Sequence, residues 1–285
     1  GAISYFQNKD LQAIDYLTQC IHITEELRKT AKGSARRDYL ASQLPVYQFL
    51  TSAHLHQKDL KQAFQTLELS KAKLLAETLA GTENFSLSSA EQLQHTLLPE
   101  TAAIFYANTN LNQMIQTVVT AQEFSSLELT TAEYLMRTYA HLHQEIQQTQ
   151  TASSTRGSRS VTLNEPSVVS IPADTTLEQL VTRYRNLLLQ PSPAQLTQRK
   201  EMARALYDLL IKPHLTNLEG KKELLIVPEG ILAYLPFETL MDEQGKYLIE
   251  TYQIRYIQSL SVLELLQKRT YDSNRKTMLA FGGAV

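Results

Sequence analysis

The chain has 285 residues, of which 43% are hydrophobic, and a formal net charge of −2. A chain of this length and composition can form two domains with ordinary hydrophobic cores, and its nearly neutral charge argues against a nucleic-acid-binding surface. No segment approaches 18 consecutive apolar residues and no signal peptide is recognisable, so we expect no membrane span and no membrane partner.

The single cysteine, Cys20, excludes an internal disulfide and favours a reducing compartment. We therefore expect a cytoplasmic protein. The chain begins inside a helical pattern at Gly1 and ends with Gly282–Val285, directly after a strand pattern. From these two ends we expect a fragment of a longer protein.

Residues 1–80 have a helical pattern with an internal repeat. The segment Lys9–Ile14 recurs as Lys58–Phe64, and each copy follows a helix that carries aromatic or aliphatic residues. A small residue, a leucine and a second small residue recur in both copies, at Ala13, Leu17 and Cys20 and at Ala63, Leu67 and Ser70. This spacing resembles the second helix of a tetratricopeptide (TPR) unit, where small side chains let helices approach closely.

A TPR unit has about 34 residues, and the offset between the two copies is longer, so a plain antiparallel helical bundle is the alternative. The last helix of this part continues to Gly81, a plausible C-cap. A short helix at about 88–97 follows, with Ser86–Ser89 as possible caps. We assign residues 1–98 to TPR-like helical hairpins.

After Pro99 the pattern changes to strands. Three segments rich in β-branched and aromatic residues, 102–107, 114–120 and 123–129, predict an antiparallel three-strand meander. A helix should follow from Thr130 or Thr131 to Gln148.

Residues 149–173 show little periodicity and predict a disordered loop. Such a loop would serve either as a surface connection or, less simply, as a cleavable linker. Two helices are expected next, at about 175–189 and 194–212.

The segment Leu224–Val227 consists of four aliphatic residues and predicts a strand buried on both faces, as in a mostly parallel sheet. Pro228 ends it, and Gly230 permits a positive φ in the turn that follows. A half-exposed strand at 253–257, a helix capped by Ser259 or Ser261 and a last strand at 277–281 complete the pattern; the helix runs to about Arg269.

Several blocks after residue 200 resemble the opening of a CHAT domain. They are Val227–Gly230, Leu235–Leu240, Tyr247–Glu250 and Gln258–Leu263. The CHAT family belongs with the caspase-like and separase-like cysteine peptidases and usually follows TPR repeats. The resemblance implies a bacterial α + α/β protein in which residues 99–285 form the first, non-catalytic half of a caspase-like CHAT domain.

The catalytic part of that family is not recognisable in this sequence. A caspase-type mechanism needs a histidine and a cysteine thiolate that meet in space, and the resemblance implies that both would follow strands later than 277–281. Cys20 lies in the helical repeat, where a free cysteine normally acts as a small hydrophobe. We therefore predict no catalytic residue in this chain.

No metal or cofactor site is predicted either. The pairs His54/His56 and His141/His143 are spaced i, i+2, which points the rings to different faces of a helix. His22 is separated from Cys20 in the same way. His95 and His214 lie near predicted helix ends, where an interaction with the helix dipole is the ordinary explanation. Gly282–Gly283 lacks the lysine of a phosphate loop.

Two carboxylates flank the turn after the strand at 224–227. Glu229 and Glu238 are candidates for binding an amine or a guanidinium group, although Glu238 is more simply a helix cap or a solvated side chain. Four tyrosines are most simply core edges of amphipathic helices: Tyr134, Tyr139, Tyr184 and Tyr207.

The resemblance implies a TPR-regulated cysteine endopeptidase, in which the helical groove binds a protein or peptide and a missing C-terminal half carries the catalysis. The alternative is a non-catalytic TPR scaffold or adaptor. A small-molecule enzyme of the doubly wound type is a third possibility, but the sequence has no phosphate-binding glycine pattern for it.

Overall fold

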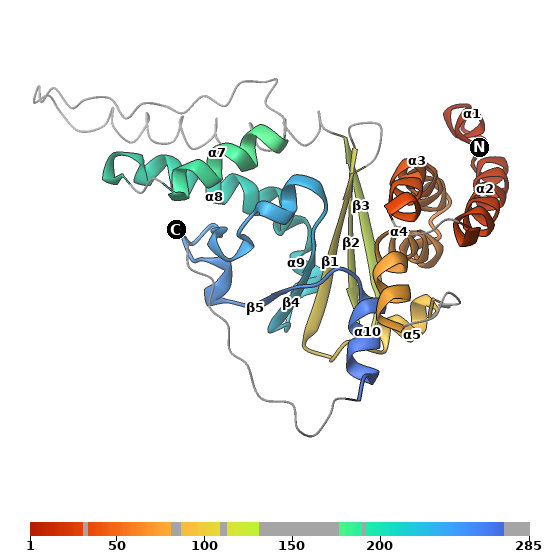
Figure 1. Cartoon of the computed structure of the whole chain (residues 1–285). Coiled ribbons are helices and arrows are strands. Elements are labelled where there is room, and N and C mark those ends of the chain that lie inside the picture. The colour runs from red at the N-terminus through yellow and green to blue at the C-terminus, as the bar shows by residue number, and fades with distance from the viewer. Residues whose placement is uncertain (31–33, 81–86, 109–112, 131–176, 190–191, 271–285) are drawn as a thin grey trace, which may run out of the picture.

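The structure is a computed structural model that describes residues 1–30, 34–80, 87–108, 113–130, 177–189 and 192–270 (Figure 1). Three predicted elements lie outside the described residues: the helix up to Gln148, the loop at 149–173 and the strand at 277–281. In the described part of the chain, no helix is long and apolar enough to cross a lipid bilayer.

Five strands form one mixed sheet. They are β1 (Thr101–Asn108), β2 (Gln113–Thr120), β3 (Phe124–Thr130), β4 (Glu223–Val227) and β5 (Gln253–Tyr256). Their order is β3-β2-β1-β4-β5; β1–β2 and β2–β3 are antiparallel, whereas β1–β4 and β4–β5 are parallel. The predicted meander and the parallel strand at 224–227 are both confirmed, and the class is mixed helix and sheet.

The β1–β4 pair lies at the centre of the sheet, and both of its faces are buried. Successive side chains of a strand point to opposite faces, so Ile104 and Ile226 contribute to one hydrophobic core while Phe105 and Val227 contribute to another. All four side chains are at most 1% exposed. Two helical layers therefore have to cover this sheet.

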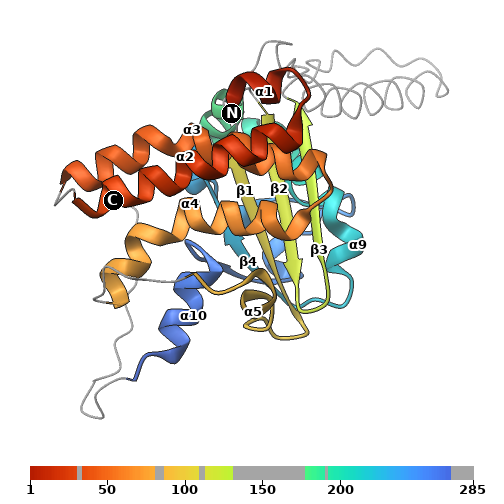
Figure 2. The ribbon, with the colours of Figure 1, turned by 90° about the vertical axis from the view of Figure 1, so that its right-hand side faces the viewer.

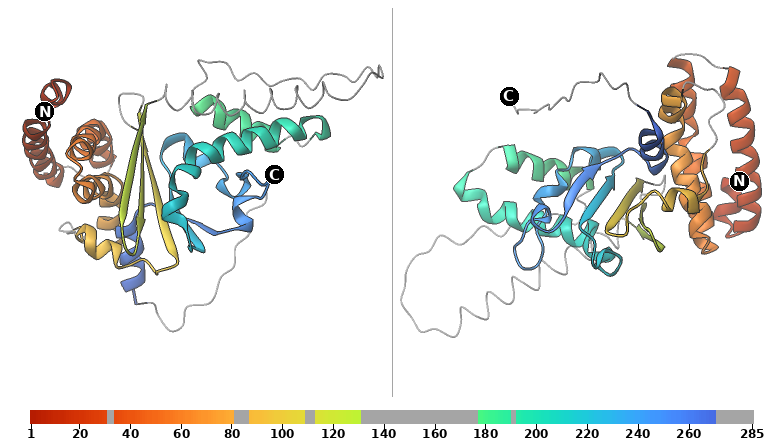
Figure 3. Two further views of the ribbon diagram at one scale, coloured as in Figure 1. Left: turned by 180° about the vertical axis from the view of Figure 1, so that it is seen from behind. Right: turned by 90° about the horizontal axis from the view of Figure 1, so that it is seen from below.

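Helices α7 (Leu177–Leu189), α8 (Leu196–Leu210) and α9 (Leu215–Leu218) lie on the first face, as Figure 3 shows from behind. The turns that follow β4 pack into the same core. Two tyrosine hydroxyls form hydrogen bonds within this layer. Tyr106 donates to the Leu210 carbonyl at 2.7 Å, and Tyr184 donates to the Thr239 carbonyl at 2.8 Å. Burial raises the pKa of Tyr184 to about 12.

Helices α4 (Leu60–Ala80), α5 (Ala90–Gln94) and α10 (Leu260–Lys268) cover the second face (Figure 2). Phe64 of α4 meets Phe105 of β1 edge to face, with ring centroids 5.2 Å apart. The core on this face thus joins residues from both sides of the predicted boundary between 1–98 and 99–285, a division that stays a prediction.

The remaining helices are α1 (Ala2–Phe6), α2 (Asp10–Thr30) and α3 (Ser34–His56), which lie outside α4. The predicted repeat is visible in the backbone, because the α1–α2 and α3–α4 turns share one conformation at a spacing of 50 residues. Asn8 has φ 56° and Lys58 has φ 59°. The next amide in each turn donates to a carbonyl five residues back at 2.9 Å, as in a Schellman motif.

The Phe64–Phe105 contact leads to a stability prediction. Replacing Phe64 with alanine should lower the free energy of unfolding by about 3–5 kcal/mol, because the cavity left in the core collapses only partly. Urea unfolding followed by circular dichroism measures this loss.

Phe6→Ala is the matched control, since the Phe6 side chain is 59% exposed. Its effect should stay below about 1 kcal/mol. Equal losses in the two variants would mean that α4 is not anchored to the sheet through Phe64.

Candidate functional site

The best-defined polar site joins α4 to the sheet and to α10. We call it the α4 junction and define it by Glu68 and Lys71 of α4, Glu229 after β4, and Leu260 and Ser261 at the start of α10. Its members are far apart in sequence, but α4 and α10 lie side by side on the same face of the sheet (Figure 2).

Glu68 is a fully buried carboxylate, with 0% of the residue exposed. It accepts hydrogen bonds from the Leu260 amide at 2.8 Å, from the Ser261 amide at 3.0 Å and from the Ser261 hydroxyl at 2.6 Å. The first amides of a helix have no partner inside the helix. Glu68 thus caps α10 from a different part of the chain.

The chain also caps α10 locally. Ser259 accepts a hydrogen bond from the Val262 amide at 3.1 Å, so of the two predicted caps, Ser259 and Ser261, the structure has Ser259. The amides of Leu260, Ser261 and Val262 are therefore all paired.

Opposing effects act on the Glu68 carboxyl. Burial has the largest effect and raises the pKa of Glu68 above its ordinary value; the hydrogen bonds from Ser261 and the α10 amides, and the nearby charge of Lys71, lower it by less. A helix N-terminus also favours a negative charge. The donors surrounding Glu68 suit a carboxylate oxygen, since the Leu260 amide, the Ser261 amide and the Ser261 hydroxyl each donate a hydrogen to it.

Lys71 lies one helical turn after Glu68 and forms an ion pair with Glu229 at 2.6 Å. The Lys71 side chain is 10% exposed and that of Glu229 is 32% exposed. Glu229 follows β4, where Gly230 has the predicted positive φ, 57°. The amine that Glu229 was predicted to bind is thus supplied by the chain itself.

A second anchor holds the middle of α10. The Ser88 hydroxyl donates to Glu264 at 2.7 Å, and Lys268 donates to the other carboxylate oxygen at 2.6 Å. Helix α10 is therefore held by polar contacts to two segments, α4 through Glu68 and the residues just before α5 through Ser88.

Glu238, the other predicted carboxylate, is partly exposed to solvent, and a neighbouring tyrosine hydroxyl occupies one of its oxygens. It accepts the Tyr256 hydroxyl at 2.8 Å, while that hydroxyl accepts the Phe237 amide at 2.9 Å. Burial raises the pKa of Tyr256, and the bond to Glu238 raises it further. These contacts fix the turn after β4 to the edge strand β5.

The prediction that His214 interacts with a helix dipole is wrong. His214 is 1% exposed, and its Nε2 donates to the Gln116 side-chain oxygen at 2.6 Å. Burial lowers the pKa of His214 to about 4, so the ring is neutral at pH 7 and is part of the core.

His56 lies beside two carboxylates and an aromatic ring. His56 contacts Asp10 at 3.3 Å and Glu128 at 3.8 Å, and its ring stacks on Tyr5. Within the described ranges, no three His, Cys, Asp or Glu side chains are arranged to hold a metal ion. His141, His143 and Gly282–Gly283 lie outside the described residues.

Cys20 is a free thiol on α2 and is partly exposed, so it is less buried than a packing position implies. Cys20 lies on α2, whereas the α4 junction is formed by α4, α10 and the turn after β4. The structure does not place it at the α4 junction.

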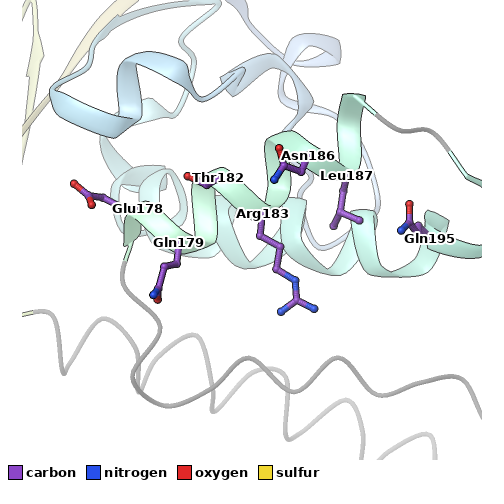
Figure 4. A pocket seen from close by; sticks show the side chains of 7 residues that line it. All are labelled: Glu178, Gln179, Thr182, Arg183, Asn186, Leu187 and Gln195. Atoms are coloured by element: carbon purple, nitrogen blue, oxygen red, sulfur yellow. The ribbon is translucent and has the colours of Figure 1, made fainter.

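A pocket of about 500 Å³ runs along the outer side of α7 (Figure 4). Its described walls are Glu178, Gln179, Thr182, Arg183, Asn186, Leu187 and Gln195. They include neither a cysteine nor a histidine, so these walls do not provide a cysteine-peptidase site.

Sequence reasoning missed Glu68 and Lys71. A signal was present, because Phe64, Leu67, Glu68 and Lys71 share the i, i+3, i+4, i+7 spacing of one helix face. Two charged residues on an otherwise apolar face indicate buried, paired charges.

Comparison with known proteins gives one family match. Residues 200–285 match the CHAT domain family. This segment contains most of α8 together with β4, β5 and α10. It therefore includes Glu229, Leu260 and Ser261 of the α4 junction, whereas Glu68 and Lys71 lie before it. No curated protein matches the chain.

The Glu68 cap leads to a second stability prediction. Glu68→Ala leaves two backbone amides and a hydroxyl without their acceptor, so the free energy of unfolding should fall by about 2 kcal/mol. In the variant, the Leu260 and Ser261 amides should exchange their hydrogens faster than in the wild type, and this increase should be larger than that of the β1 amides. Gln62→Ala, at an exposed position of the same helix, is the control and should change neither quantity.

His214 leads to a pH prediction. Its pKa is lower in the folded protein than the ordinary value of 6.5. The contribution of neutral His214 to the free energy of unfolding is therefore complete above pH 6.5 and is lost as the pH falls toward 4. The loss should reach roughly 3 kcal/mol. Urea unfolding at a series of pH values measures it, and the His214→Gln variant should show a shallower slope between pH 6.5 and 4.

Proposed function

We propose that this chain is the regulatory, protein-binding part of a CHAT-type cysteine endopeptidase. In this proposal α1–α4 are TPR-type hairpins that bind a protein or peptide partner, and the segment with the sheet is the non-catalytic caspase-like half. The CHAT match of residues 200–285 supports the family assignment.

The α4 junction is the observation that carries the proposal. Helix α4 is the last helix of the repeated hairpins, and its Glu68 caps α10 inside the CHAT-matching segment. A buried carboxylate that loses its donors is costly. A shift of α4 caused by partner binding would therefore shift α10 with it.

The chain itself is proposed to be inactive. Its single cysteine is Cys20 on α2, and residues 200–285 contain none. The same observation favours a second candidate, a non-catalytic scaffold in which the helices bind proteins and the CHAT-like part has only a structural role.

The test uses the natural full-length protein that contains this sequence. Under the peptidase proposal, a thiol-directed probe labels a cysteine other than Cys20 and the protein cleaves labelled casein. Glu68→Ala should raise this cleavage at least threefold, because it releases α10 from the hairpins. Cys20→Ser and Gln62→Ala are the controls and should leave the rate unchanged.

Absence of both labelling and cleavage would favour the scaffold. Cleavage that responds equally to Glu68→Ala and Gln62→Ala would contradict the role of the α4 junction while leaving the peptidase assignment in place.

A further inference from the structure

Arginine and tyrosine side chains meet on the surface where α7 contacts the turns that follow β4. The guanidinium carbon of Arg185 on α7 lies 5.2 Å from the centre of the Tyr234 ring, which is a cation–π contact. Tyr234 ends the turn Gly230–Tyr234, and 62% of this residue is exposed. The stacked pair is therefore accessible to a partner from solution.

Two further side chains lie on the same side of α7, because both act on the buried Tyr184. Burial has the largest effect and raises the pKa of Tyr184 to about 12; the charge of Arg199 opposes this rise, and Tyr247 adds to it. Tyr184 and Arg185 are neighbours on α7, and both contact the turns after β4. We call Arg185, Arg199, Tyr234 and Tyr247 the arginine–tyrosine surface.

The two positive charges of this surface are not neutralised by a carboxylate that the structure describes. Within the described ranges, neither Arg185 nor Arg199 forms an ion pair or a hydrogen bond through its side chain, and both residues are partly exposed. Glu250 is the carboxylate beside Tyr247, and it accepts the Tyr247 amide at 2.6 Å. The N–H donors of both guanidinium groups therefore remain available to an external acceptor.

Stacking prepares Arg185 to bind a carboxylate. A guanidinium group on an aromatic ring has one face covered, whereas the N–H groups at its edge remain free and match the two oxygens of a carboxylate. The stack also restricts the side chain before binding, which reduces the entropy lost on association. Exposed tyrosine rings add apolar contact area, and tyrosine and arginine are both enriched at the centre of protein interfaces.

We infer that the arginine–tyrosine surface binds an acidic peptide segment of a partner protein. Carboxylates of the segment pair with Arg185 and Arg199, and its apolar atoms pack on Tyr234 and Tyr247. The chain has a net charge of −2, so its overall charge does not attract an acidic segment and the attraction has to be local. This inference does not depend on the proposed function.

The experiment titrates the chain into a capped, fluorescein-labelled peptide of glutamate, leucine and glycine and follows the fluorescence anisotropy. Arg185→Glu should weaken binding at least tenfold, because it replaces an attraction with a repulsion. Arg183→Glu is the matched control, since it makes the same charge change on the same helix. Arg183 lines the pocket on the outer side of α7 (Figure 4), so this control should change the affinity less than twofold.

Tyr234→Ala tests the stacked pair separately from the charge. It should weaken binding at least threefold, although it leaves the net charge unchanged. Each variant must retain the far-ultraviolet circular dichroism of the wild type. Arg185→Gln replaces Arg185→Glu if that variant does not, and its expected loss of affinity is at least threefold.

Three results would overturn the inference. The first is no binding of the acidic peptide to the wild-type chain. The second is an equal loss of affinity in Arg183→Glu and Arg185→Glu, which would indicate an unspecific attraction to the charge of α7. The third is equally tight binding of inorganic polyphosphate that Arg185→Glu also abolishes, because the surface would then accept any polyanion.

Discussion

The buried carboxylate of Glu68 fixes how α4 and α10 lie against each other on the sheet. Its oxygens need donors, and α10 supplies them with the amides that its own first turn leaves unpaired. Two groups that are each costly to bury alone are thereby buried together. Because the partners are 192 and 193 residues apart in sequence, the contact fixes the whole second helical layer.

The two faces of the sheet are stabilised in different ways. On the α7–α8 face, apolar side chains fill the space between helix and sheet, and hydroxyls such as those of Tyr106 and Tyr184 donate to nearby carbonyls. On the α4–α10 face, an aromatic contact through Phe64 combines with the charged groups of the α4 junction. Directional, charged contacts favour one relative position of the helices, whereas apolar packing tolerates several.

Elements encoded by neighbouring residues could be predicted from the sequence. The meander follows from β-branched segments, the strand at 224–227 from four aliphatic residues, and the Ser259 cap and Gly230 turn from single residues. Glu68 and His214 could not, because their roles depend on burial by distant segments: α10 for Glu68 and Gln116 of β2 for His214. The spacing along α4 indicated only that charges lie on its apolar face.

The topology of the sheet also sets the order in which it can be completed. Strands β2 and β3 pair with close sequence neighbours, but β1 pairs with β4, where Thr101 is opposite Glu223. During synthesis on the ribosome, the meander can therefore form while the other edge of β1 still lacks its neighbour. That edge is apolar on both faces, the kind that associates with other chains. Early packing of α4 onto β1 through Phe64 would cover one face of this nascent edge long before the rest of the sheet has been made.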